Sequence, residues 1–500
     1  MVRLSPETSF SLRDFFIQPG WTPAGLTYDK VDLSVQLPGG VVLRYPFIAA
    51  DMACVSGYDM TLECARNGLM AVVPASFPIE EQADIIRRVK AQEVKRGDLE
   101  FQDPVRIDVT STVEQAMRMY DEFGHSTIPI CDSFRRLRGV FRYRDGITGD
   151  TSISLERALS NGDPGFAGSI APFDKATAVH GRQYCTDEDS PEFVHERMRE
   201  QGISFMPIID RNGVLQQLAF VYKFNGYAVG AAIHTHPGWK DRARAAVDAG
   251  ADTMFTTASS CKSDYLVAVA REFKELYPGK PLITGNGVDL EGFNRACVDV
   301  GAAGFKEGMG SGGSCITTHG RGVGRGIYTA LKEVSDANEG LGEDRKVIIG
   351  DGGIGTRRLK KETQDGKVLN WIEHDARTIG VALAFSDAVM MGTGFNILEE
   401  AAGNLLAYRG ERFRGRWGEG SRKARTLQRY GIGERVKRAA IEEGIEDYVS
   451  VQGRLKPLME KLGTQLQVTL TNVGAKDLKE FREKVVLEFA SPNAIQDAGV

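Results

Sequence analysis

Eight short apolar segments recur along the chain, and amphipathic stretches with helical spacing lie between several of them. The helical spacing is clear at 238–250 (GWKDRARAAVDAG) and at 290–301 (LEGFNRACVDVG). Nearly continuous apolar strands that alternate with such helices are typical of a parallel sheet with both faces buried. Eight such units predict an α/β fold of the (β/α)8 TIM barrel type, although a doubly wound sheet would give the same local pattern. The segments lie at 46–52, 69–75, 227–233, 251–257, 281–286, 302–308, 346–353 and 387–392.

A long interval separates the second apolar segment from the third, and it contains an internal repeat. GHSTIPICD (124–132) and GISFMPIID (202–210) share the pattern G-x-S-x-x-P-I-x-D, and each follows a helical stretch and precedes a strand. Such a tandem unit resembles a pair of CBS motifs, a Bateman domain, inserted in a barrel loop. An insert with a purely structural role is the alternative. The expected parts are barrel residues 1–94, the insert 95–225, and barrel residues 226–500 with an active-site flap at about 408–450.

Composition and charge exclude several functional classes. Of the 500 residues, 42% are hydrophobic and 26% are charged, as in an ordinary globular chain. The net charge of −5 gives no support for a nucleic-acid partner. No apolar run approaches the roughly 18 residues of a membrane span, and the N-terminal segment lacks the apolar core of a signal peptide. The chain has 7 cysteines without a CxxC pair, which indicates free thiols in a reducing compartment, so we expect a cytoplasmic protein.

The segment GMGSGGSCITTHG (308–320) carries the main candidate for covalent chemistry. Cys315 follows a glycine-rich turn after the sixth predicted strand, where backbone N–H groups can lower the pKa of a thiol and make it a nucleophile. Thr317 stands two positions further on and could assist proton transfer. A buried thiol in a loop is the alternative. The glycines also match G-x-G-x-x-G, but no helix starts there, so we do not interpret them as a dinucleotide fingerprint.

Two further glycine-rich loops, GDGGI (350–354) and MGTG (391–394), end the seventh and eighth predicted strands. In TIM barrels the loops after these two strands often bind a phosphate group. Asp351 is then placed to bind a ribose diol, and Gly353, Gly392 and Thr393 are placed to bind phosphate oxygens. A helix cap or a turn is the alternative role for Asp351.

Two other features carry weaker signals. His234 and His236 end the third predicted strand at a spacing that can bind zinc, but no other histidine ends a barrel strand, so polar loop histidines are the favoured interpretation. A basic segment at 410–431 contains the adjacent pair Arg429 and Tyr430. On an acidic chain this segment indicates a mobile loop that folds over an anionic ligand rather than a nucleic-acid arm.

Together these motifs resemble the family of inosine-5′-monophosphate dehydrogenase (IMP dehydrogenase) over nearly the whole chain. G-x-G-x-x-C-x-T at 310–317 resembles its catalytic-cysteine loop, and DGGI at 351–354 resembles its ribose and phosphate loop. The tandem insert has the place of the family's CBS pair. WGEGSRKARTLQRY (417–430) resembles the mobile flap of a bacterial and protozoal subgroup, and further similarity lies at 442–449 and 472–478.

The resemblance implies a reaction and the residues that perform it. Cys315 would attack C2 of the purine, and hydride would leave to NAD. Thr317, Arg429 and Tyr430 would then activate water to release xanthosine monophosphate (XMP). The implied substrate-binding residues are Met52, Ser314, Asp351, Gly353, Gly392, Thr393, Glu419 and Glu443. The implied cofactor-binding residues are Thr257, Ser259 and Asn286, and the backbone carbonyls of Gly310, Gly312 and Cys315 would bind K⁺.

Several positions depart from the family pattern. Thr257 replaces an aspartate that holds the nicotinamide ribose, and Gly313 replaces a phosphate-binding serine, with Ser314 one position later. Thr318 and Arg416 replace an arginine and a flap tyrosine. These differences fall on the dinucleotide side and the phosphate side of the expected site.

Three functions therefore stay open. The first is oxidation of IMP, or of a close purine nucleotide analogue, to XMP with NAD in guanine nucleotide synthesis. The second is a reductive deamination of the GMP reductase type, against which the Arg–Tyr pair argues. The third is a nucleotide-sensing homologue without dehydrogenase activity. The resemblance also implies a homo-oligomer, tetramer or octamer, with regulatory purine nucleotides at the insert.

Overall fold

The computed structural model describes residues 8–123, 127–142, 147–161, 164–166, 169–172, 184–201, 203, 205–310, 312, 322–421, 423–424 and 446–497. The chain divides into two compact units. The first comprises Met1–Glu93, Tyr227–Leu455 and Lys461–Val500, and the second comprises Val94–Gly226 and Lys456–Glu460.

A closed barrel of parallel strands forms the core of the first unit, in the order β14-β15-β16-β17-β18-β21-β4-β5. These are the eight strands that the apolar segments predict, so the (β/α)8 prediction is confirmed. Every residue of β5 and β21 is buried, which explains why such segments read as continuous apolar runs. The barrel strands are β4 (Phe47–Ala49), β5 (Met70–Val73), β14 (Val229–Ile233), β15 (Thr253–Thr256), β16 (Leu282–Gly287), β17 (Gly304–Glu307), β18 (Val347–Asp351) and β21 (Ala388–Met391).

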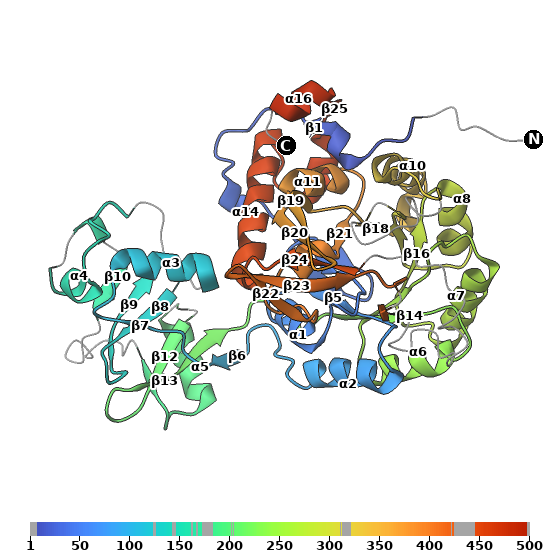
Figure 1. The fold of residues 1–500 in the computed structure, drawn as a ribbon. Coiled ribbons are helices and arrows are strands. Elements are labelled where there is room, and N and C mark those ends of the chain that lie inside the picture. Colours follow the sequence, from blue (N-terminus) through green and yellow to red (C-terminus); the bar gives the residue numbers. More distant parts are fainter. Residues whose placement is uncertain are drawn as a thin grey trace, which may run out of the picture. The chain divides into compact units, whose positions relative to one another are not determined.

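Helices follow the barrel strands and form its outer layer (Figure 1). They are α1 (Tyr58–Arg66), α2 (Ile79–Lys90), α6 (Trp239–Asp248), α7 (Asp264–Leu276), α8 (Leu290–Phe293), α10 (Ile327–Glu339), α11 (Ala376–Leu383) and α12 (Thr393–Asn396). The stretch expected to be one helix at 290–301 is α8 followed by a π-helical turn, Asn294–Val298. The remaining elements of this unit are β1 (Phe15–Ile17), β2 (Val35–Leu37), β3 (Val41–Leu43), α14 (Leu455–Val473), α15 (Leu478–Lys484), β25 (Leu487–Phe489), α16 (Pro492–Asp497) and the 3-10 turns Leu12–Asp14, Tyr28–Lys30 and Gly342–Asp344.

A second sheet in this unit, in the order β19-β20-β24-β23-β22, includes a hairpin that the sequence analysis missed. Its strands are β19 (Thr356–Gln364), β20 (Lys367–His374), β22 (Leu405–Tyr408), β23 (Glu411–Trp417) and β24 (Glu446–Ser450). Most residues of β19 are exposed, and polar or charged residues stand at nearly every position, so the segment has no apolar run. The signal for it is the dipeptide Asp365-Gly366, which adopts positive φ angles of 49° and 74° at the hairpin turn.

The second unit consists of two similar four-stranded sheets, β10-β9-β8-β7 and β11-β12-β13-β6. In each, a short strand pairs parallel with the strand of the sequence repeat, which pairs antiparallel with the next. The repeat is therefore a repeated strand–helix–strand–strand unit, whereas its identity as a CBS pair stays a prediction. The elements are β6 (Leu99–Gln102), β7 (Ile107–Asp108), α3 (Val113–Phe123), β8 (Thr127–Cys131), β9 (Leu137–Arg142), α4 (Leu155–Asn161), a 3-10 turn (Pro164–Phe166), β10 (Ile170–Pro172), β11 (Cys185–Thr186), α5 (Pro191–Glu200), β12 (Phe205–Ile209) and β13 (Leu215–Val221). Among all the residues described, no helix has the length and hydropathy to cross a membrane.

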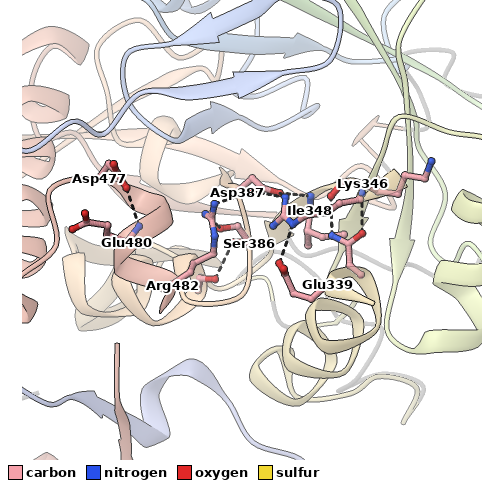
Figure 2. A network of polar contacts seen from close by, with 11 residues as sticks. Glu339, Lys346, Ile348, Ser386, Asp387, Asp477, Glu480 and Arg482 are labelled. Atoms are coloured by element: carbon pink, nitrogen blue, oxygen red, sulfur yellow. Dashed lines mark hydrogen bonds and ion pairs between the residues drawn. The ribbon is translucent and has the colours of Figure 1, made fainter. Parts of the chain in front are cut away.

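A polar network fastens the amino-terminal ends of β18 and β21 (Figure 2). Asp387, which is 5% exposed, binds Arg345 Nη1 through both carboxylate oxygens at 3.0 and 3.2 Å. The same carboxylate accepts a hydrogen bond from the backbone N–H of Ile348 at 2.9 Å and pairs with Arg482 at 3.5 Å. One carboxylate therefore joins two strands and two arginines at the end of the barrel opposite the expected site.

Replacement of Asp387 by alanine should lower the free energy of unfolding by about 3 kcal/mol, because it leaves buried donors without an acceptor. Glu339→Ala is the matched control, since Glu339 binds the same Arg345 but is 63% exposed. That control should cost under about 1 kcal/mol. Urea unfolding followed by fluorescence measures both, and equal effects of the two variants would refute the role given to Asp387.

Candidate active site

A cavity of about 930 Å³ opens at the carboxyl ends of the barrel strands. It is lined by residues that follow β4, β15, β16, β17, β18 and β21, together with the start of the flap segment. The predicted site residues on its wall are Met52, Thr257, Ser259, Asn286, Gly310, Gly312, Asp351, Gly353, Gly392, Thr393 and Glu419. Residues as far apart in the sequence as Met52 and Glu419 would otherwise have no reason to meet, so the barrel topology alone brings them together. The remaining candidates, Ser314, Cys315, Thr317, Arg429, Tyr430 and Glu443, lie outside the described residues.

Lys306 forms the charged centre of the cavity floor. Its Nζ lies 3.1 Å from Asp51 Oδ1 and 3.5 Å from Asp351 Oδ2, and the lysine is only 2% exposed. Burial acts to lower the pKa of Lys306, but the two carboxylates outweigh it and raise that pKa, so the lysine is charged. The sequence analysis did not single out Lys306 or Asp51.

Asn286 fixes the orientation of Asp351. Its Nδ2 donates to Asp351 Oδ2 at 2.7 Å and to the carbonyl oxygen of Gly308 at 2.9 Å. Burial raises the pKa of Asp351, and the neighbouring Lys306 opposes this effect. Because Lys306 and Asn286 hold the same oxygen, Oδ2, the other oxygen is left to receive hydrogen bonds from a ligand in the cavity.

Two glycines on the wall allow the chain to approach closely. Gly308 has a φ of 134°, and a Cβ there would lie 1.9 Å from the carbonyl oxygen of Asp351. A Cβ on Gly392 would lie 2.7 Å from Sδ of Met52. Any side chain at Gly308 would push apart the ends of β17 and β18, where the segment that leads to Cys315 and the loop of Gly353 begin.

Arg416 places a fixed cation beside Thr393. Its Nε and Nη2 bind the two oxygens of Asp447 at 2.8 and 2.5 Å, and its Nη1 donates to Thr393 Oγ1 at 2.9 Å. Arg416 lies on the wall of the cavity, and the residue is 5% exposed. The sequence analysis noted Arg416 only as a departure from a tyrosine, whereas the structure makes it a candidate ligand for an anion.

The start of the flap segment is bound to the loop after β4. Glu419 Oε1 accepts a hydrogen bond from the backbone N–H of Ala53 at 2.8 Å. Cys54 Sγ donates to the carbonyl oxygen of Trp417 at 3.3 Å. These contacts hold Glu419 on the cavity wall, close to the predicted substrate-binding residue Met52.

The cysteines that the structure describes are unsuited to nucleophilic catalysis. All of them are buried: Cys54, Cys64, Cys131, Cys185, Cys261 and Cys297. Burial raises the pKa of Cys54, Cys131, Cys261 and Cys297 to about 12, so these thiols stay protonated near pH 7. The remaining cysteine, Cys315, follows the cavity-lining residues Gly310 and Gly312 in the sequence.

The histidine pair has a local structural role. His234 Nδ1 accepts a hydrogen bond from the backbone N–H of His236 at 3.3 Å. Within the described part of the chain, no group of three His, Cys, Asp or Glu residues could hold a metal ion.

Comparison with known proteins gives consistent matches over the whole chain. Residues 9–500 match the model of the IMP dehydrogenase / GMP reductase domain. Inosine-5′-monophosphate dehydrogenase of Tritrichomonas foetus is 26% identical over 527 aligned residues, covering 100% of this chain and 97% of that protein. The Aquifex aeolicus protein of the same name is 26% identical, covering 91% and 88%.

Among solved structures, a GMP reductase variant of Trypanosoma brucei in complex with guanosine 5′-monophosphate has a similar fold. Its TM-score is 0.66 at 22% identity, and the alignment covers 99% of this chain and 98% of that one. A second structure of the same variant gives a TM-score of 0.61 at 20% identity. At these identities the likeness concerns the fold.

Proposed function

Because the chain belongs to the IMP dehydrogenase / GMP reductase domain family of oxidoreductases, we propose that it oxidises IMP, or a close purine nucleotide analogue, at C2 with NAD. The observation that carries the proposal is the single cavity that holds Asp351, Asn286, Thr393 and the start of the cysteine loop. The curated relatives that match over nearly their full length are named as IMP dehydrogenases, which supports the same choice.

The proposed reaction begins at Cys315. Its thiolate attacks C2 of the purine, and the C2 hydride leaves; NAD, when bound, would be the acceptor of that hydride. The cysteine is then joined to the oxidised purine as a thioimidate. Water activated by Thr317 and the Arg429–Tyr430 pair adds to C2, the C–S bond breaks, and XMP leaves while the thiol is restored.

The described residues position the nucleotide for this attack. Asp351, held by Lys306 and Asn286, receives hydrogen bonds from the ribose hydroxyls. Thr393 and the neighbouring Gly392 bind the 5′-phosphate, and Arg416 provides the positive charge beside them. The phosphate therefore has a cation close by although Gly313 replaces the family's serine.

The dinucleotide would lie on the opposite side of the mouth. Thr257 and Ser259 follow β15 on the cavity wall and offer hydroxyl groups to its ribose. These hydroxyl groups can form hydrogen bonds with a ribose, but not the charge-assisted hydrogen bond that an aspartate would form. We therefore expect a higher KM for NAD than in relatives with the aspartate. The carbonyls of Gly310, Gly312 and Cys315 would hold K⁺.

The test is turnover followed by NADH absorbance. Full-length protein with IMP and NAD should produce NADH and XMP, whereas GMP with NADPH should give no consumption of NADPH. The opposite result would identify a reductive deaminase of the GMP reductase type. Activity with neither pair, in a protein that binds the nucleotides, would favour a sensing homologue.

Replacement of Arg429 by alanine should slow the release of the covalent intermediate far more than its formation, because the pair with Tyr430 activates water in this proposal. Stopped-flow absorbance should then show a burst of NADH followed by a slow steady state. Arg412→Ala is the control, since Arg412 is exposed and pairs with Glu399 outside the cavity. If Arg429 only binds an anion, its variant would raise KM and show no burst.

A further inference from the structure

Asp51 is a charged residue of the cavity wall that has no role in the proposed reaction. It follows β4, lines the cavity and is 6% exposed. Its Oδ1 accepts a hydrogen bond from Lys306 Nζ at 3.1 Å. No described residue donates a hydrogen bond to the other oxygen, Oδ2, and that oxygen is not among the fully buried polar atoms that lack a partner. Asp51 therefore offers an accessible and unused acceptor to a ligand in the cavity.

Asp351, the second carboxylate partner of Lys306, offers another such acceptor. Lys306 Nζ lies 3.5 Å from Asp351 Oδ2, and Asn286 Nδ2 donates to the same oxygen at 2.7 Å. Asp351 Oδ1 receives no hydrogen bond from any residue that the structure describes, and it too is not a fully buried atom without a partner. The cavity floor thus presents two free carboxylate oxygens, one from each aspartate.

The charge of the floor indicates which part of a nucleotide it would meet. Two carboxylates face one ammonium group, so a surplus of negative charge remains, and a phosphate at this place would be repelled. Thr393 and Arg416, at the loop assigned to the phosphate, are a separate pair of polar groups on the cavity wall. A neutral group with hydroxyl donors therefore fits the floor better than an anion does.

The two free oxygens match the two hydroxyl groups of a ribose. The 2′- and 3′-hydroxyls stand on adjacent carbons, and each is a hydrogen-bond donor. Asp351 has only Oδ1 left for them, whereas Asp351 and Asp51 together give each hydroxyl a charged acceptor of its own. Lys306, which is 2% exposed, holds both carboxylates, so neither can turn away without the loss of an ion pair.

We propose that Asp51 is a specificity-determining residue of the substrate site, whose Oδ2 accepts a hydrogen bond from one ribose hydroxyl of the nucleotide while Asp351 Oδ1 accepts from the other. The site then selects ribonucleotides over both the 2′-deoxy and the 3′-deoxy forms. This inference rests on the proposed function, which places the ribose at Asp351.

Isothermal titration of the full-length protein with IMP, 2′-deoxy-IMP and 3′-deoxy-IMP tests the assignment without any variant. Each deoxy analogue should bind at least roughly tenfold more weakly than IMP, because each loses one hydrogen bond to a charged acceptor. A deoxy analogue that binds as tightly as IMP would overturn the proposal, since one hydroxyl would then have no acceptor.

Replacement of Asp51 by asparagine identifies the acceptor. Lys306 can only donate, so the amide oxygen of Asp51→Asn should face it, and the NH₂ group should take the place of Oδ2. The affinity penalty of one deoxy analogue should then fall below about threefold, while the penalty of the other stays; Asp351→Asn should show the reverse. Each penalty is a ratio within one variant, so a general weakening of the site cancels. Two penalties that stay unchanged or fall equally in Asp51→Asn would show that Asp51 only balances the charge of Lys306.

Asp14→Asn is the matched control, because Asp14 is another carboxylate of the cavity wall, but its Oδ2 accepts from the backbone N–H of Ser11. Both penalties should be unchanged in this variant. Titration with NAD and with its nicotinic acid analogue tests the other ligand of the cavity. If Asp51→Asn alters the preference between these two dinucleotides and leaves the ribose penalties as they were, the assignment to the substrate ribose is wrong.

Turnover with IMP and NAD is measured separately, so the two proposals can fail independently. A penalty that responds to Asp51→Asn in a protein without NADH formation would refute the proposed reaction and retain the role of Asp51. NADH formation with penalties that do not respond would retain the reaction and refute that role.

Discussion

Replacement of Cys315 by alanine should reduce turnover by at least about 10⁴-fold, while the affinity for the nucleotide stays within about tenfold. The sulfur forms the bond to C2 and is not needed to hold the ribose or the phosphate, which Asp351, Thr393 and Arg416 bind in this proposal. The described cysteines are buried, and burial raises the pKa of Cys54 and Cys261 to about 12, so neither thiol can supply a thiolate in its place.

Steady-state rates with IMP and NAD, together with titration calorimetry of IMP, separate the two quantities. Cys131→Ala is the control, since Cys131 is a buried thiol of the second unit and should leave turnover unchanged. A Cys315→Ala variant that keeps full activity would end the covalent mechanism, whereas a loss of nucleotide binding would show that Cys315 has a structural role.

Replacement of Lys306 by methionine should weaken IMP binding by roughly a hundredfold and lower the free energy of unfolding by about 3–5 kcal/mol. Methionine fills a similar volume but leaves Asp51 and Asp351 buried without a cation between them. Asp351 would then take up a proton or turn away, and its contact with the ribose would be lost.

The pH dependence of this variant has a defined sign. In the folded variant Asp351 has a raised pKa, since burial already raises the pKa of Asp351 with Lys306 in place. A group with a raised folded-state pKa binds its proton more readily in the folded state, so the loss of stability should shrink as the pH falls towards about 5. Urea unfolding at several pH values measures this trend. The exposed Lys332, which pairs with Asp336, provides the control: Lys332→Met should cost under about 1 kcal/mol at every pH.

The barrel was predictable because its strands are buried on both faces, and each therefore appears in the sequence as a short apolar run. The β19–β20 hairpin was missed because its residues face solvent and carry charge, as in TRRLKKETQ, so that only the Asp365-Gly366 turn marks it. That hairpin supplies Arg357 to the cavity wall, and none of the motifs at the ends of the barrel strands indicates a charged residue there.

Within the site, the glycine-rich loops identified Asp351 and Thr393. In each loop a polar side chain stands beside glycines directly after a barrel strand, which is where a TIM barrel binds its ligand. Lys306 and Asp51 were missed because each is a charged residue at the end of an apolar segment, AAGFKEG and PFIAADM, with nothing in either segment to indicate its partner. Barrel closure brings the two side chains together, so their ion pair is not visible in either segment alone.

The most direct test of the central claim is the intact mass of the protein, quenched with acid during turnover. With IMP and NAD together, the unmodified protein should carry one purine nucleotide, and peptide mapping should place it on Cys315; Cys315→Ala should carry none. Formation of NADH without any adduct on the unmodified protein, or with an adduct on another residue, would contradict the account.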